Sequence, residues 1–278
     1  MTNDSKSKNP IERYGGAIDI AHIPRAFAVY RHLLGLLPKD PRCKACHAPF
    51  KGVGALIVRV LLGKRPSNYS ALLCNKCEKS IREHPGGAEV ELTILFADVR
   101  GSTALAEKMS PSAFRDLIDR FYTTATKIFV RSDAFIDKLS GDEVLAVYLP
   151  ALAGPDHAAR AIEAARELMK ATGHADIGGP WIRVGAGIHT GIAWLGSLGT
   201  PDGVTDLTVL GDAVNTASRL ASEAGAGEIV VSEQSMRAGQ IETGNYARRG
   251  LRLKGKTEEV LVCVLKTGKA GLDAGSSG

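Results

Sequence analysis

A short apolar run that ends on an acidic residue constrains the fold of this chain more than any other feature. Residues 92–96 read Leu-Thr-Ile-Leu-Phe, a pattern that predicts a buried strand. Asp98 stands at the end of that strand, and a Gly-Ser-Thr turn follows before an amphipathic helix that begins at Pro111. An acid at a strand end, beside a turn of free backbone amides, can hold a cation and a phosphate together. The alternative is an aspartate that only caps the turn.

Strands and helices are predicted to alternate from residue 89 onward. After the helix at Pro111, capped by Ser110, we expect helices over 156–170 and 213–223, strands over 134–139, 144–149, 181–189, 192–195, 208–210 and 228–231, and a closing hairpin of 246–253 with 260–265. Turns are expected at residues 140–142 and 190–191. The first of these turns places Asp142 at a strand end, like Asp98.

The chain has no pattern that predicts a membrane span or a secretion signal. Residues 1–10 are polar, and the most apolar run, 53–62, contains Arg59 and is shorter than the ~20 residues that span a bilayer. We therefore expect a cytoplasmic protein with no membrane partner, in which thiols stay reduced.

Four of the five cysteines form two Cys-x-x-Cys pairs, at positions 43, 46, 74 and 77. In a reducing compartment this spacing favours a four-thiolate metal site, with structural zinc expected and an iron–sulfur cluster as the rival. Four unrelated buried cysteines are the third reading, and His47 is a possible substitute ligand. Cys263 lies in an apolar run and is expected in the core.

The predicted domain boundary is the Pro-Gly-Gly segment that ends at residue 87. We expect an N-terminal helix (18–37) and metal-binding module in residues 1–88, a catalytic domain in 89–268 and a flexible tail in 269–278. The net charge of +5 comes from the basic front of the chain. Nucleic-acid binding is nevertheless not expected, because only Phe50 and Tyr69 lie near the cysteines as aromatic stacking partners.

Polar residues next to the predicted turns suggest phosphoryl chemistry. Asp98 and Asp142 can reach one sheet edge and face Mg²⁺. Asn215 and Arg219 are four residues apart on one predicted helix, so they share a face that can hold a ribose and a developing charge on phosphorus. Taken singly, each residue is equally explained as a turn cap or a solvated side chain.

Together, these segments resemble the catalytic domain of class III nucleotidyl cyclases, which make cyclic AMP or cyclic GMP. The resemblance rests on five motifs in the family's order: Phe96 to Thr103, Lys138 to Asp142, Arg183 to Gly191, Thr208 to Arg219, and Leu253 to Lys256. It covers residues 89–268 and implies a ferredoxin-like α/β sandwich with a mostly antiparallel sheet. Residues 1–88, the helical and metal-ribbon module, lie outside it.

The resemblance also implies a role for each matched residue. Asp98 and Asp142 would bind two Mg²⁺ or Mn²⁺ ions, which help deprotonate the ribose 3′-hydroxyl and clamp the phosphates. Arg219 would steady the α-phosphate and Asn215 the ribose. The remaining substrate contacts would come from Lys254 at the terminal phosphates, from the backbone of Gly101, Ser102 and Thr103, and from Lys138 and Thr208 at the purine.

Lys138 favours ATP over GTP, because the family's guanine readers carry a glutamate at that place. Thr208, where mammalian-type members have an aspartate, resembles a bacterial subgroup. Arg100 beside Asp98 departs from the family pattern and is expected either at a phosphate or in solvent.

Family members build each site from two domains, so a chain with one full set of residues is expected to form a homodimer with two equal sites. The predicted function is an adenylate cyclase. A guanylate cyclase and a catalytically silent nucleotide-binding domain are the alternatives.

Overall fold

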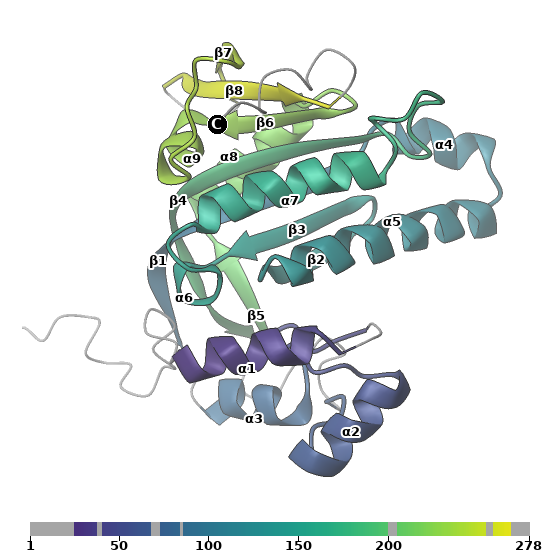
Figure 1. Cartoon of the computed structure of the whole chain (residues 1–278), viewed down its shortest axis with the longest axis vertical. Coiled ribbons are helices and arrows are strands. Elements are labelled where there is room, and N and C mark those ends of the chain that lie inside the picture. The colour runs from purple at the N-terminus through teal and green to yellow at the C-terminus, as the bar shows by residue number, and fades with distance from the viewer. Residues whose placement is uncertain are drawn as a thin grey trace, which may run out of the picture.

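The computed structural model describes residues 25–37, 41–67, 73–83, 86–199, 205–253 and 258–267. Three N-terminal helices, α1 (Arg25–Gly35), α2 (Gly52–Leu62) and α3 (Asn75–Glu83), lie together at one end of an α/β domain, near β5 (Thr205–Leu210) (Figure 1). The expected N-terminal helix is therefore present as α1, and residues 18–24 lie outside the described ranges. No helix in those ranges is long and apolar enough to cross a membrane.

One sheet carries the α/β domain. Its strands lie in the order β2 (Phe135–Ser140), β3 (Glu143–Tyr148), β1 (Gly87–Val99), β4 (Val184–Gly199), β6 (Glu228–Ser232), β8 (Val260–Lys266) and β7 (Ala247–Leu251), and β5 pairs with the end of β4. All neighbours are antiparallel except β4 with β6. The predicted mostly antiparallel α/β fold is confirmed, including the closing hairpin of β7 and β8.

Both faces of the sheet are covered, because successive residues of a strand point to opposite sides. Leu95 of β1 joins a core formed with α5 (Pro111–Arg131) and α7 (His157–Ala171), whereas Ile94 joins a second core formed with α8 (Asp212–Glu223). Figure 1 shows α5 and α7 on the near side of the sheet and α8 behind it. Asp98 follows the Ile94 alternation and therefore belongs to the α8 side.

Local signals place the helix starts well. Ser110 caps α5 as expected: its hydroxyl oxygen accepts a hydrogen bond from the Ala113 amide at 3.2 Å. Three short helices complete the domain, namely α4 (Ser102–Lys108), α6 (Pro150–Ala153) and α9 (Glu233–Ala238). α4 follows Gly101, whose φ of 73° suits a residue without a side chain.

The predicted turn at Thr190-Gly191 is wrong, because β4 runs without a break through both residues. The Thr190 hydroxyl shares a 2.8 Å hydrogen bond with Thr93 of β1 and donates to Ser235 at 3.0 Å, so it anchors the strand inside the protein. A Cβ at Gly191 would lie 3.1 Å from the Ala213 side chain of α8. This glycine therefore serves close helix packing rather than a turn.

The N-terminal module is tied to the α/β domain through a buried arginine. Arg31 of α1 donates to the carbonyl of Ala45, between the first two cysteines, at 2.9 Å. It also donates to the carbonyls of Asp133 and Ala134, just before β2, at 3.1 and 2.7 Å. Because the Arg31 side chain is only 1% exposed, these hydrogen bonds link the two parts in a dry environment. β1 begins at Gly87, and the domain boundary at this segment stays a prediction.

Candidate functional site

The end of β1 and the β2–β3 turn bring two acids together. β1 pairs with β3 so that Asp98 stands opposite Glu143, and the Val99 amide donates to the Asp142 carbonyl at 3.1 Å. The turn itself forms as predicted, with Gly141 at a φ of 62°. The antiparallel ladder thus places Asp98 and Asp142 side by side at one sheet edge.

These acids form a half-buried negative site. Burial raises the pKa of Asp98 to about 6; Arg100 opposes this shift and Asp142 adds to it. Burial, with the charges of Asp98 and Asp142, also raises the pKa of Glu143 to about 6. Carboxylates that are crowded and partly desolvated gain from a divalent cation, and their oxygens are ligands that Mg²⁺ and Mn²⁺ accept. The residues at this edge therefore fit such an ion.

Arg100 supplies the countercharge at this site. Its guanidinium contacts the Asp98 carboxylate, and a second nitrogen donates to the carbonyl of Ser222 in α8 at 3.3 Å. The side chain is 19% exposed, so it neither extends into solvent nor stands apart from the acids. Of the two positions that the sequence allowed for Arg100, the one in solvent is therefore excluded.

Asn215 and Arg219 of α8 make no hydrogen bond or ion pair with the acids among the described residues, although Arg100 joins Asp98 to the Ser222 carbonyl of the same helix. Asn215 is exposed and Arg219 is half-buried, one helical turn further on. Within the described part of the chain, neither side chain has a hydrogen bond or ion pair, and the same holds for the exposed Lys138 on β2. Within the described ranges, no hydrogen bond or ion pair therefore joins the aspartate pair directly to Asn215 or Arg219.

Thr208 of β5 reaches β2 through a residue that the sequence analysis missed. Its hydroxyl donates to Asp137 at 3.1 Å, and Asp137 directly precedes Lys138. The two expected purine-contacting residues are therefore brought to one region. Lys254 lies outside the described residues. At the start of α4, Gly101 and Thr103 are exposed and Ser102 is half-buried.

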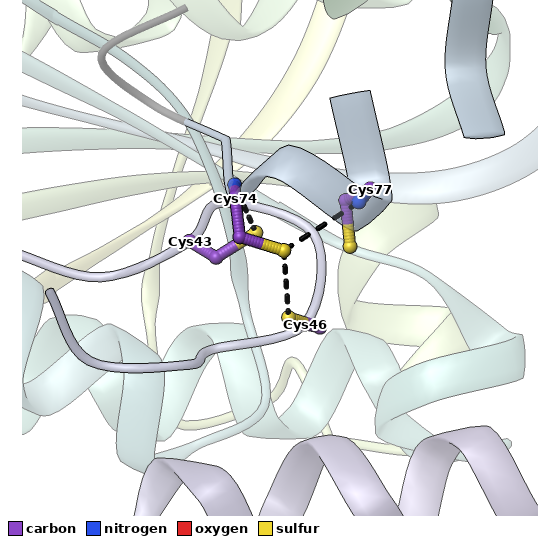
Figure 2. Close-up of side chains that lie close together, drawn as sticks. All are labelled: Cys43, Cys46, Cys74 and Cys77. Carbon is purple, nitrogen blue, oxygen red and sulfur yellow. Dashed lines mark hydrogen bonds between the residues drawn. The ribbon is translucent and has the colours of Figure 1, made fainter. Parts of the chain in front are cut away.

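The four cysteines predicted as metal ligands form one cluster between α1, α2 and α3 (Figure 2). Their sulfur atoms all lie within 4.8 Å of one another, and three of the four residues are buried. Figure 2 shows the side chains of Cys43, Cys46 and Cys77 around that of Cys74. Four sulfurs at this spacing fit a tetrahedral metal site. His47 is not part of the cluster, so the alternative of a histidine ligand is not supported.

An amide and an ammonium donate hydrogen bonds to the sulfurs of the cluster. The amide of Cys74 donates to Cys43 at 3.2 Å, and the ammonium of Lys64 donates to Cys46 at 3.3 Å. Burial disfavours the charge of Lys64, but the negative sulfurs of Cys77, Cys46 and Cys74 outweigh burial and raise its pKa. Hydrogen bonds led by the one from Cys43 lower the pKa of Cys74, which immediately precedes α3. Hydrogen bonds among the sulfurs also lower the pKa of Cys46, whereas they raise the pKa values of Cys43 and Cys77, so metal binding has to displace protons from part of the cluster.

Four residues of these sites were not predicted: Lys44, which pairs with Asp137 at 3.3 Å, and Lys64, Asp137 and Glu143. Glu143 follows Asp142 directly, and no pattern marked it. Asp137 lies where the register of β2 against β3 shifts by one residue, so strand alternation gave no signal for it. Lys44 had no local signal beyond its place between two cysteines.

Comparison with known proteins matches the part of the chain that forms the α/β domain. Residues 87–266 match the family model of the adenylate and guanylate cyclase catalytic domain. An adenylate cyclase of Anabaena cylindrica is 31% identical over 187 residues, which cover 63% of this chain and 36% of that protein. The receptor-type guanylate cyclase gcy-13 of Caenorhabditis elegans is 32% identical over 145 residues, 51% of this chain and 14% of that protein. The chain thus matches well under two thirds of the length of these relatives.

Solved structures show the same fold. The guanylyl cyclase Cya2 superposes with a TM-score of 0.59 at 24% identity, over 66% of this chain and 96% of that one. The adenylyl cyclase CyaB from P. aeruginosa gives 0.57 at 27% identity, over 65% and 96%. The family match spans the whole sheet that carries the aspartate pair and α8, and this chain therefore belongs to the family of adenylate and guanylate cyclase catalytic domains.

Proposed function

We propose that the chain is an adenylate cyclase that converts ATP to 3′,5′-cyclic AMP and pyrophosphate. The observation that carries the choice of ATP is Lys138, an exposed ammonium on β2 with no hydrogen bond or salt bridge among the described residues. An ammonium can only donate hydrogen bonds. It suits adenine, whose ring N1 is an acceptor, and opposes guanine, whose N1 carries a proton.

Asp98 and Asp142 would hold two Mg²⁺ or Mn²⁺ ions. When bound, these ions supply the positive charge that favours an ionised ribose 3′-hydroxyl and neutralises the triphosphate. Around them, Asn215 would orient the ribose and Arg219 would meet the negative charge that develops on the α-phosphate. The terminal phosphates would be held by Lys254 and by the backbone of residues 101–103.

The active form would be a homodimer in which each site takes its aspartates from one chain and its other residues from the second. The α8 side chains support this proposal, because neither Asn215 nor Arg219 has a hydrogen bond or ion pair with the aspartates among the described residues of its own chain. A two-fold axis completes both sites at once.

The N-terminal residues 1–88 would form a zinc module that regulates or helps dimerise the catalytic domain, residues 89–268. Four thiolates with amide and ammonium donors suit structural zinc. An iron–sulfur cluster is the alternative, and it would colour the protein. We place the protein in the cytoplasm, where such thiols stay reduced.

Product identification tests the proposal. The purified full chain is incubated with ATP or with GTP in the presence of Mg²⁺ or Mn²⁺. The products are separated by chromatography and identified by mass spectrometry. We expect cyclic AMP as the main product, with turnover lost in Asp98→Asn and kept in the control Asp116→Asn, whose carboxylate is 71% exposed on α5. Cyclic GMP as the main product would establish the guanylate alternative, and no product from a dimeric protein would establish the silent one.

A further inference from the structure

A buried ion pair joins the four-cysteine module to the strand that carries Lys138. Lys44 lies between Cys43 and Cys46, and its ammonium is 3.3 Å from one carboxylate oxygen of Asp137. The side chains of Lys44 and Asp137 are only 3% and 4% exposed, so the pair is shielded from water. The ammonium also lies 3.2 Å from Asp206 at the start of β5. A charge from the module is thus fixed inside the α/β domain.

The second oxygen of Asp137 accepts the hydrogen bond from the Thr208 hydroxyl at 3.1 Å. A hydroxyl has one proton to donate. Since an ionised carboxylate can only accept, that proton is committed to Asp137, and the oxygen of Thr208 presents only lone pairs to any further partner. Burial raises the pKa of Asp137, and the charge of Lys44 opposes that shift and so favours the ionised form.

The direction of this hydroxyl distinguishes the two purines. Adenine carries an amino group at position 6, which donates, whereas guanine carries a carbonyl oxygen there, which accepts. A Thr208 oxygen that can only accept is matched to adenine and mismatched to guanine. Lys44, Asp137 and Lys138 line one cavity of about 400 Å³, and Thr208 reaches this cavity's wall through its hydrogen bond to Asp137.

We propose that Lys44 and Asp137 are positioning residues that set the preference for ATP over GTP by holding the Thr208 hydroxyl as an acceptor. The cysteine module thereby takes a direct part in base selection. The inference rests on the proposed function, in which Thr208 contacts the purine.

The principal test is Asp137→Asn, which keeps the shape of the side chain. Lys44 can only donate, so it holds the oxygen of the new amide, and the amide nitrogen then faces Thr208. That nitrogen donates to the hydroxyl oxygen, and the hydroxyl proton is released to meet the carbonyl of guanine. We expect the ratio of kcat/KM for ATP to that for GTP to fall about tenfold, the usual effect of one hydrogen bond at a discriminating site.

The matched control is Asp206→Asn, because Asp206 also contacts Lys44 but not Thr208. Its ratio should equal that of the wild type, and so should that of Lys44→Arg, which keeps the charge. A loss of folded protein lowers both activities equally and leaves the ratio unchanged. A ratio unaltered by Asp137→Asn overturns the inference.

A second variant keeps the inference testable if the Asp137→Asn protein does not fold. Thr208→Val removes the hydroxyl while keeping its size, and should lower the ratio by itself. Adding Lys44→Met to Thr208→Val should then change the ratio no further, because the two act through one hydroxyl. A further fall in the double variant would show that Lys44 acts elsewhere.

Failure of the proposed function has a different signature. If the wild type makes neither product, the same ratio is measured as displacement of a fluorescent ATP analogue by ATP and by GTP. Tighter displacement by ATP that Asp137→Asn abolishes supports the inference without catalysis. Equal displacement by both nucleotides in the wild type overturns it.

Discussion

Arg100 gives the sharpest test of the metal site, because its guanidinium contacts the carboxylate that a cation would need. A metal ion at Asp98 must displace Arg100 or share the carboxylate with it. Arg100→Gln removes the positive charge and retains a polar side chain of similar reach. We expect the variant to bind Mg²⁺ and Mn²⁺ more tightly than the wild type.

The size of the effect follows from the geometry. Two unit charges in contact near a protein surface attract by about 4 kcal/mol at an effective dielectric constant of about 20. The side chains of Arg100 and Asp98 are 19% and 25% exposed, so solvent and salt screen part of this attraction. A remaining competition of about 1–2 kcal/mol corresponds to an affinity change of roughly 5- to 30-fold.

The assay measures the Mn²⁺ concentration at half-saturation, both in turnover and by calorimetric titration, at pH 8, where Asp98 is ionised. Arg115→Gln is the control, because its exposed guanidinium on α5 is paired with Asp116 and not with the site. Arg100 lowers the pKa of Asp98, so its removal should also move the pH midpoint of metal binding upward. Equal or weaker metal binding by Arg100→Gln would show that Arg100 supports the site rather than competes for it.

Three further predictions concern the shared sites of the dimer, the ionisation of Asp98 and the docking of the N-terminal module. Mixing inactive Asp98→Ala and Arg219→Ala chains should restore part of the activity, because one of the two hybrid sites is complete; absence of rescue in proven heterodimers would contradict shared sites. The pKa of Asp98 is about 6 in the folded protein and about 4 in the unfolded chain, so ionised Asp98 lowers the free energy of unfolding above about pH 6. This destabilisation is absent below about pH 4. Since Mg²⁺ binds the ionised carboxylate, it should raise the Tm at pH 7.5 and hardly change it at pH 5. Arg31→Met should lower the free energy of unfolding by about 3 kcal/mol, as three buried carbonyls lose their donor, whereas an unchanged denaturant midpoint would show that the module docks without it.

The sequence predicted those parts of the structure whose signals are local. Ser110 followed by a proline, the glycine turn at 141 and the paired cysteine spacing each act within a few residues, and each forms as expected. Thr190 misled the prediction because its partners, Thr93 and Ser235, are distant in sequence and hold the strand straight. These long-range hydrogen bonds therefore outweigh the local preference of this segment for a turn.

The contacts that join the module to the catalytic domain had no local signal at all. Arg31 reaches Ala134 across 103 residues, and Lys44 reaches Asp206 across 162. Burial of an arginine or a lysine is exceptional in proteins unless its charge is paired, so neither pattern nor propensity could have placed them inside. Because these contacts join residues that are far apart in the sequence, they hold the N-terminal module on the α/β domain.

Arg31 and Lys44 also join the Cys43–Cys46 loop to β2 and the residue before it, so a metal bound at the cysteine cluster would influence the catalytic domain. The loop from Cys43 to Cys46 contains only two other residues: Ala45 accepts from Arg31, and Lys44 pairs with Asp137. A metal that holds both cysteines therefore stiffens the loop that supports the beginning and the middle of β2. We expect removal of this metal with a mercurial, followed by dialysis into Mg²⁺, to lower the ratio of ATP to GTP turnover along with the Tm. A lower Tm with an intact ratio would mean that the module only stabilises the fold and that Lys44 stays in place without the metal.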